Sequence, residues 1–233
     1  INYIMKKILF LFFVVFLSFS SQATHIMGGE ITWICIKDPT SPDVGKYIFT
    51  MKVYRDCDGS TLNQGTEIIY VWNHPGVTQI SLNWQATNDI TPDGTGVNCL
   101  DCNTNPVGAV EEYIYESQPI ILPGIPPADG WQFTWDLCCR NWAVTNFNVT
   151  PGQTGFTLRA SMFPYTDPGG NLVPADPCFD SSPIFKEQAK TILCTGYQFS
   201  YNNLGFDIEL DSISYSWDDP LDDFTGTFNP PVN

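Results

Sequence analysis

The stretch Trp131-Gln-Phe-Thr-Trp-Asp-Leu-Cys-Cys-Arg-Asn-Trp142 has the clearest strand period in the chain. Every second residue of this stretch is apolar or carries a thiol, namely Trp131, Phe133, Trp135, Leu137 and Cys139. The residues between them are Gln132, Thr134, Asp136, Cys138 and Arg140, which are polar apart from the cysteine. Because side chains alternate between the two faces of a strand, one face is predicted to be core and the other polar. We therefore interpret the stretch as a strand of a β-sandwich.

The adjacent thiols Cys138 and Cys139 predict two separate disulfide partners. In a strand they point to opposite faces, and a bond between neighbours needs a strained ring. One disulfide with one free thiol is the alternative. The expected disulfide cysteines number eight in all: Cys35, Cys57, Cys99, Cys102, Cys138, Cys139, Cys178 and Cys194. Eight cysteines allow 105 connectivities, and we expect only that Cys178 pairs with Cys194, across a short loop.

Residues 1–23 are interpreted as a secretory signal peptide. Lys6 and Lys7 precede ten apolar residues, 8–17, and Ser21-Gln-Ala23 supplies the small residues of a cleavage site. Ten apolar residues are too few to cross a bilayer, which needs roughly 20. We expect a secreted or cell-surface protein whose mature chain has no transmembrane helix and whose cysteines are oxidised.

The chain is strongly acidic. Its formal charge is −15, and loss of Lys6 and Lys7 leaves 8 basic residues against 25 acidic ones, which gives −17. This balance argues against nucleic acid or anionic lipid as a partner and is compatible with cation binding.

Short strands are predicted along the whole chain. In the first part they cover residues 30–36, 46–54, 67–73, 77–84, 110–118 and 156–163, with a hairpin turn at His74-Pro-Gly76. No stretch of about twelve residues has a helical period, and 18 glycines and 18 prolines interrupt the chain. The predicted fold class is all-β, built from disulfide-stabilised β-sandwich modules.

Two modules in tandem are expected. The first covers residues 24–163, and a Pro- and Gly-rich linker covers 164–177. Residues 178–233 then begin a second module, with strands at 182–185, 191–201 and 207–217. A β-sandwich needs about 100 residues, so the second module is expected to be truncated.

Several motifs together resemble the N-terminal region of large Bacteroidota surface proteins. The motifs are Thr24-His-Ile-Met-Gly-Gly-Glu-Ile31, Val53-Tyr-Arg-Asp-Cys57, Cys138-Cys-Arg-Asn141, Cys178 with Ser182-Pro-Ile-Phe185, and Ile192-Leu-Cys194. Proteins of that kind commonly end in gliding-motility-associated or type IX secretion sorting domains. The resemblance departs at Phe206-Asp-Ile-Glu-Leu-Asp211, where the family usually has an Asp-Pro-Asp-Gly-Asp run.

The resemblance implies immunoglobulin- or cadherin-like modules and a non-catalytic role. The expected function is that of an adhesin or of a gliding-motility-associated display module, exported across the outer membrane. Its expected partners are the secretion machinery and an extracellular glycan or protein ligand.

Asp207, Glu209 and Asp211 are the candidate metal ligands. In an extended strand their alternation places three carboxylates on one face, within reach of a calcium ion, which prefers six to eight oxygen ligands. A solvated acidic face is the alternative. Arg55 and Arg140, each beside a cysteine, are expected to form structural ion pairs with Asp56 and Asp136 at strand ends, with a ligand role as the alternative.

Two other functions compete with adhesion. The seven tryptophans suggest a carbohydrate-binding module. Trp33, Trp131 and Trp135 are predicted to point inward, which leaves Trp72, Trp84 and Trp142 as exposed candidates. A secreted hydrolase is the other alternative, but the sequence has no nucleophile elbow, histidine metal motif or phosphate-binding loop, so we expect no enzymatic activity.

Overall fold

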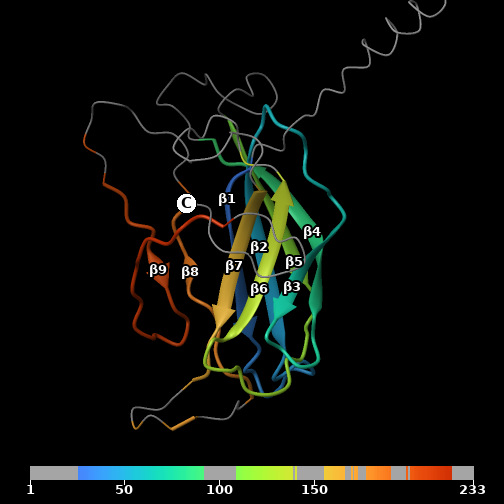
Figure 1. Ribbon diagram of the computed structural model, residues 1–233, viewed down its shortest axis with the longest axis vertical. Coiled ribbons are helices and arrows are strands. Elements are labelled where there is room, and N and C mark those ends of the chain that lie inside the picture. Colours follow the sequence, from blue (N-terminus) through green and yellow to red (C-terminus); the bar gives the residue numbers. More distant parts are fainter. Residues whose placement is uncertain are drawn as a thin grey trace, which may run out of the picture.

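The computed structural model describes residues 26–91, 109–138, 140, 155–165, 169, 171–172, 177–189, 198 and 200–221. Nine strands occur in these ranges (Figure 1). They are β1 (Ile26–Cys35), β2 (Tyr47–Asp56), β3 (Thr66–Trp72), β4 (Gln79–Asp89), β5 (Val110–Ser117), β6 (Trp131–Cys138), β7 (Gly155–Met162), β8 (Ile184–Phe185) and β9 (Gly205–Phe206). The described part of the chain contains no helix, and so none that could cross a membrane. The all-β prediction is confirmed.

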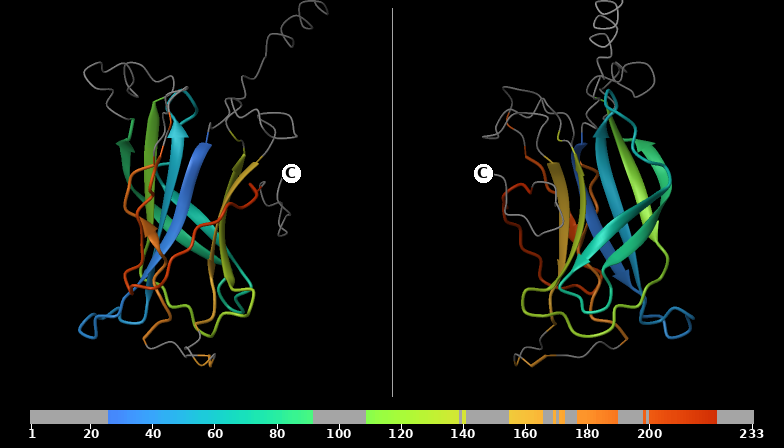
Figure 2. Two further views of the ribbon diagram at one scale, coloured as in Figure 1. Left: turned by 90° about the vertical axis from the view of Figure 1, so that its left-hand side faces the viewer. Right: turned by 45° about the vertical axis from the view of Figure 1, so that its right-hand side comes forward.

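Seven strands form one antiparallel sheet that folds into two layers. The strand order is β1-β2-β5-β4-β3-β6-β7, and β8 pairs with β9 separately. Figure 2 shows β6 and β7 standing apart from β1, β2 and β5, while the β3–β4 hairpin crosses between the layers. This arrangement is the expected β-sandwich. The predicted pairing of the first two strands and the predicted hairpin are both present.

The two layers meet again along β1 and β7. Gly29 on β1 lies so close to β7 that a Cβ atom there would approach the Leu158 Cδ1 atom to 2.8 Å. Ile26 also forms a parallel bridge with Arg140 just beyond β6. The absence of a side chain at Gly29 therefore lets the sandwich close along this edge.

Aromatic side chains fill the space between the layers. Phe49 on β2 and Phe133 on β6 are fully buried, with their ring centroids 4.7 Å apart. Trp33 on β1 packs against both rings, at 5.8 Å and 5.5 Å. Each such ring contributes about 1.5–3 kcal/mol by burial, so this cluster is a main source of stability. The predicted core face of β6 is confirmed, because Trp131, Phe133 and Trp135 are all buried.

The opposite face of β6 is polar but is covered rather than solvated. Thr134 is completely buried and accepts a hydrogen bond of 2.7 Å from Trp72 Nε1. Gln132 is also buried, and its side-chain oxygen Oε1 accepts a hydrogen bond from the Ser161 hydroxyl group. Neighbouring side chains thus provide hydrogen-bond partners for Thr134 and Gln132, which lie on the predicted polar face of β6.

A short segment after the predicted linker is fixed to the exposed edge of β1. We call residues 178–182 the strap. Cys178 forms a disulfide with Cys35 across 143 positions, so the predicted Cys178–Cys194 pairing is wrong. Cys178 and Phe179 belong to the core of the first sandwich, although the sequence placed them at the start of a second module.

Hydrogen bonds continue the attachment of the strap beyond the disulfide. Trp33 N donates to Ser182 Oγ at 2.8 Å, and Ser182 N donates to Trp33 O at 2.9 Å. Cys35 N donates to Ser181 Oγ at 3.1 Å. Two serine side chains thereby accept backbone N–H groups that an edge strand would otherwise present to solvent.

The predicted strand at 207–217 is not present. A turn follows β9, and the Asp207 Oδ1 atom accepts hydrogen bonds from the backbone N–H groups of Glu209 at 2.9 Å and Asp211 at 3.0 Å. Leu210 has a φ of 68°, in the left-handed region. The Asp207 side chain thus offers the backbone a local alternative to strand pairing, which a period count does not detect.

Candidate functional site

Three carboxylates meet beside the strap. One oxygen from each of Asp180, Asp207 and Glu209 lies within 4.8 Å of the others. We call these residues the acidic cluster. Asp207, Glu209 and Asp211 were predicted to act together from one face of a strand, and that premise is wrong because they follow β9 in a turn. Asp211 is not part of the acidic cluster, and its backbone N–H group donates to Asp207 Oδ1. The turn brings Asp207 and Glu209 to Asp180, which sequence reasoning missed because it lies far away along the chain.

The acidic cluster is held in place by its surroundings. Asp207 is buried and fixed by the turn that it caps. Glu209 Oε1 accepts a hydrogen bond of 3.0 Å from Ser181 Oγ and lies 2.8 Å from Lys37 Nζ. Three segments therefore converge here: the residues after β1, the strap, and the turn after β9.

Burial and mutual repulsion set the charges of the cluster. Burial, together with the carboxylates of Glu209, Asp207 and Asp211, raises the pKa of Asp180 to about 6. Burial also acts to raise the pKa of Glu209, but hydrogen bonds from Lys37 and Ser181 and the charge of Lys37 outweigh it and lower that pKa. The second Glu209 oxygen, Oε2, is buried and has no hydrogen-bond partner among the described residues.

Hard cations bind such oxygens. Calcium prefers six to eight oxygen ligands, and with one oxygen from each residue the acidic cluster supplies three, so backbone carbonyls or water would have to supply the others. Lys37 already provides one positive charge next to Glu209. A cation at this site would therefore compete with the ammonium group of Lys37.

Comparisons with known proteins were made for the whole chain. No protein-family model, curated protein or solved structure matches it. Inferences about this site therefore depend on its geometry and on the chemistry of its residues.

Arg55 forms a structural ion pair, as predicted, but its partner is Glu111 and not the expected Asp56. Its side chain is only 3% exposed, and its Nη2 pairs with Glu111 Oε2 on β5 at 2.5 Å. Its Nη1 donates to the backbone oxygens of Asp56 at 3.0 Å and Gly59 at 2.5 Å. Arg55 thereby joins the end of β2 to the following turn and to the neighbouring strand.

Arg140 joins the end of β6 to the C-terminal part of the chain. Its Nη2 donates to Leu221 O at 2.5 Å, and its guanidinium lies 5.0 Å from the centre of the Phe156 ring. These contacts also indicate a structural role.

Four of the expected disulfide cysteines lie among the described residues, and all four are bonded. Besides the Cys35–Cys178 bridge, Cys57 and Cys138 are each in a disulfide. Cys99, Cys102, Cys139 and Cys194 lie outside the described ranges, as does the predicted signal peptide.

The tryptophans divide differently from the prediction. Trp33, Trp131 and Trp135 are buried, as expected. Trp72 and Trp84 are half-buried, and their indole N–H groups donate to Thr134 and Thr87. Trp142 lies outside the described residues. Among the tryptophans that the structure describes, Trp217 is the one that is fully exposed, and it was not among the predicted exposed candidates.

Proposed function

We propose that this chain is part of a non-catalytic extracellular surface protein that acts in adhesion or display. The observation that carries this proposal is the Cys35–Cys178 disulfide, whose two cysteines are 5% and 4% exposed. Structural disulfides persist in oxidising compartments outside the cytoplasm. The signal-peptide pattern of residues 1–23 supports the same location.

The sandwich is proposed to be immunoglobulin-like, and the strand order supports this. Read in chain order, β1, β2, β5 and β4 form one layer and β3, β6 and β7 the other, as strands ABED and CFG do in constant-type immunoglobulin domains. Phe49 and Phe133 join β2 and β6, the two strands that a disulfide links in antibody domains. A second module in tandem, and export by a gliding-motility or type IX route, are further parts of the proposal.

Surface location is tested in cells that produce the protein natively. Protease added to intact cells is expected to degrade it, and Cys35 and Cys178 are expected to react with an alkylating agent only after reduction. Deletion of the coding sequence is expected to reduce attachment to surfaces. A protease-resistant protein with free thiols in the cytoplasmic fraction would refute the proposal.

Calcium is the proposed ligand of the acidic cluster. Asp180, Asp207 and Glu209 would hold the ion, which would relieve the repulsion among their carboxylates. A ligand that binds only the folded state stabilises it, by about 2.7 kcal/mol at a concentration of 100 times Kd. The melting temperature of the mature protein is therefore expected to be higher in millimolar calcium than in chelator.

The matched control for calcium is the double variant Asp207→Asn, Glu209→Gln. The asparagine side chain introduced by the first change keeps an oxygen at the position of Oδ1, so the turn after β9 is preserved while the charge is lost. The variant is expected to melt at one temperature with and without calcium. A calcium-independent melting temperature in the unmodified protein would mean that the acidic cluster does not bind the ion.

A further inference from the structure

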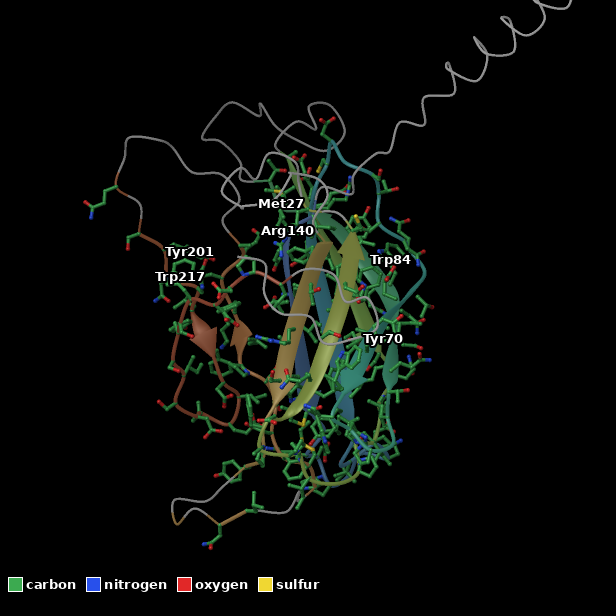
Figure 3. All side chains as sticks on the ribbon, viewed as in Figure 1. Met27, Tyr70, Trp84, Arg140, Tyr201 and Trp217 are labelled. Carbon is green, nitrogen blue, oxygen red and sulfur yellow. A yellow bond between two sulfur atoms is a disulfide. The ribbon has the colours of Figure 1, made fainter. Side chains whose placement is uncertain are left out.

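A groove lined by aromatic side chains lies on the outer side of β8 and β9. It has a volume of about 430 Å³. Its principal lining residues are Phe185, Tyr201, Tyr215 and Trp217, together with Asn202 and Asn203. We call it the aromatic groove. Figure 3 shows Tyr201 and Trp217 together on this side of the molecule, away from Tyr70 and Trp84.

The backbone holds the tyrosine rings of the groove in place. Tyr201 Oη donates a hydrogen bond of 2.7 Å to Gln188 O, and Tyr215 Oη accepts one of 2.9 Å from Gly205 N. A side chain at Gly205 would collide with the Tyr215 hydroxyl group. The two tyrosine rings are therefore positioned before any ligand arrives, which lowers the entropy cost of binding to them.

The exposure of the groove residues indicates a contact surface. The Trp217 side chain is fully exposed to solvent, and the side chains of Tyr215 and Phe185 are also exposed. Between the layers of the sandwich the large rings are buried, as at Trp131 and Phe133, and the exposed rings Tyr70, Phe163 and Tyr165 are not among the groove residues. Clustered rings that remain in solvent are characteristic of ligand-binding surfaces.

The polarity of the lining selects the class of ligand. None of the groove residues is an acid, lysine, arginine or histidine, although the chain carries a formal charge of −15. The side-chain oxygen Oδ1 of Asn202 accepts a hydrogen bond from Leu204 N at 2.9 Å, so the side-chain NH₂ group is the part that can donate to a ligand. Rings and amides together suit a neutral molecule that has both apolar faces and hydroxyl groups.

An adjoining hollow extends the same surface toward β1. It has a volume of about 280 Å³ and shares Phe185, Tyr201 and Asn203 with the aromatic groove. Its lining also includes Glu30 on β1, which pairs with Lys52, and Glu187, and these carboxylates can accept hydrogen bonds from hydroxyl groups. The two hollows together thus offer both aromatic rings and hydrogen-bonding side chains.

We propose that the aromatic groove binds a neutral carbohydrate chain. The C–H faces of a sugar ring pack on Trp217 and Tyr215, and its hydroxyl groups bond to Asn202 and Asn203. The next sugar unit extends into the adjoining hollow, toward Glu30. This proposal names the ligand class of the adhesive role above and rests on that role.

The test uses the mature protein with cellohexaose, xylohexaose, mannohexaose and maltohexaose, measured by calorimetric titration and by tryptophan fluorescence. Binding of at least one hexasaccharide is expected. Trp217→Ala is expected to weaken it at least about tenfold, because aromatic anchors carry most of the binding energy in such contacts. Since Trp217 is fully exposed, this variant should retain the melting temperature of the unmodified protein.

Two further variants make the test specific. Gly205→Ala is expected to displace Tyr215 and weaken binding, whereas Tyr70→Ala removes an exposed ring on another side of the sandwich and should leave binding unchanged. The proposal is overturned if no hexasaccharide binds, or if Trp217→Ala binds normally. It is also overturned if the groove takes only a quaternary ammonium probe or a protein.

The outcome separates this proposal from the proposed function. A protein that is accessible to protease on intact cells but binds no hexasaccharide disproves the carbohydrate groove alone. A protein that binds a hexasaccharide but stays in the cytoplasm disproves the surface role alone.

Discussion

Removing the Cys35–Cys178 disulfide is expected to destabilise the sandwich substantially. The bridge closes a loop of 143 positions, and the chain-entropy estimate for a loop of this length is about 5 kcal/mol at 25 °C. Cys57 and Cys138 lie within this loop and are themselves in disulfides, so the unfolded chain is already restricted. We therefore expect the double variant Cys35→Ala, Cys178→Ala to lose about 2–4 kcal/mol of unfolding free energy.

Urea denaturation of the mature protein, followed by tryptophan fluorescence, measures this loss. The double variant is the proper comparison because either single variant leaves one reactive thiol. Peptide mapping without reduction should show that the remaining disulfides are unchanged. A loss below about 1 kcal/mol would refute the reasoning, since it would mean that the bridge restricts the unfolded chain far less than its loop length implies.

Two predictions concern charged groups. The free energy of unfolding should contain a component that is complete below pH 3.8 and disappears as the pH rises through about 6, because burial and neighbouring carboxylates raise the folded-state pKa of Asp180. After allowance for partial exposure this component is about 1 kcal/mol, and a pH series of urea melts should show it in the unmodified protein but not in Asp180→Asn. Glu111→Gln should cost about 3 kcal/mol in the same assay, because it leaves the buried guanidinium of Arg55 without its counter-charge. Asp43→Asn, which breaks the more exposed pair with Lys46, should cost less than about 1 kcal/mol, and equal losses in the two variants would contradict this explanation.

The strands of the sandwich were predictable because their signal is local. Tyr47, Phe49, Met51 and Val53 alternate along β2 with Ile48, Thr50, Lys52 and Tyr54, and the first four are buried whereas the others are partly exposed. A strand with one buried face needs this period of two, so the pattern predicts the strand and its buried face before the neighbouring strands are known. The His74-Pro-Gly76 turn likewise marked the β3–β4 hairpin.

Features that depend on distant parts of the chain were not predictable. Cys178 has Cys194 nearer in sequence, but docking of the strap on β1 brings it to Cys35. Asp180 joins Asp207 for the same reason, because both positions depend on how the strap packs. No local period carries this information.

Two other errors have local causes. The acidic residues at 207–211 alternate with apolar ones, as residues of a half-buried strand do, but the Asp207 side chain caps a turn. Trp217 was not selected as exposed because it was read as part of that same strand. A polar side chain that bonds to nearby N–H groups can override an apparent period of two.

The position of the Cys35–Cys178 bridge also determines how the molecule bears mechanical tension. If the chain is pulled between its start and the residues after Cys178, the force passes along β1 and then through the sulfur atoms to the strap. Strands β2 to β7 belong to the loop that the bridge closes, so their backbone is not part of this path. The acidic cluster and the aromatic groove use residues beyond Cys178, so they lie within it. Tension applied in this way would therefore reach the two proposed binding sites through the bridge without passing along the backbone of β2 to β7.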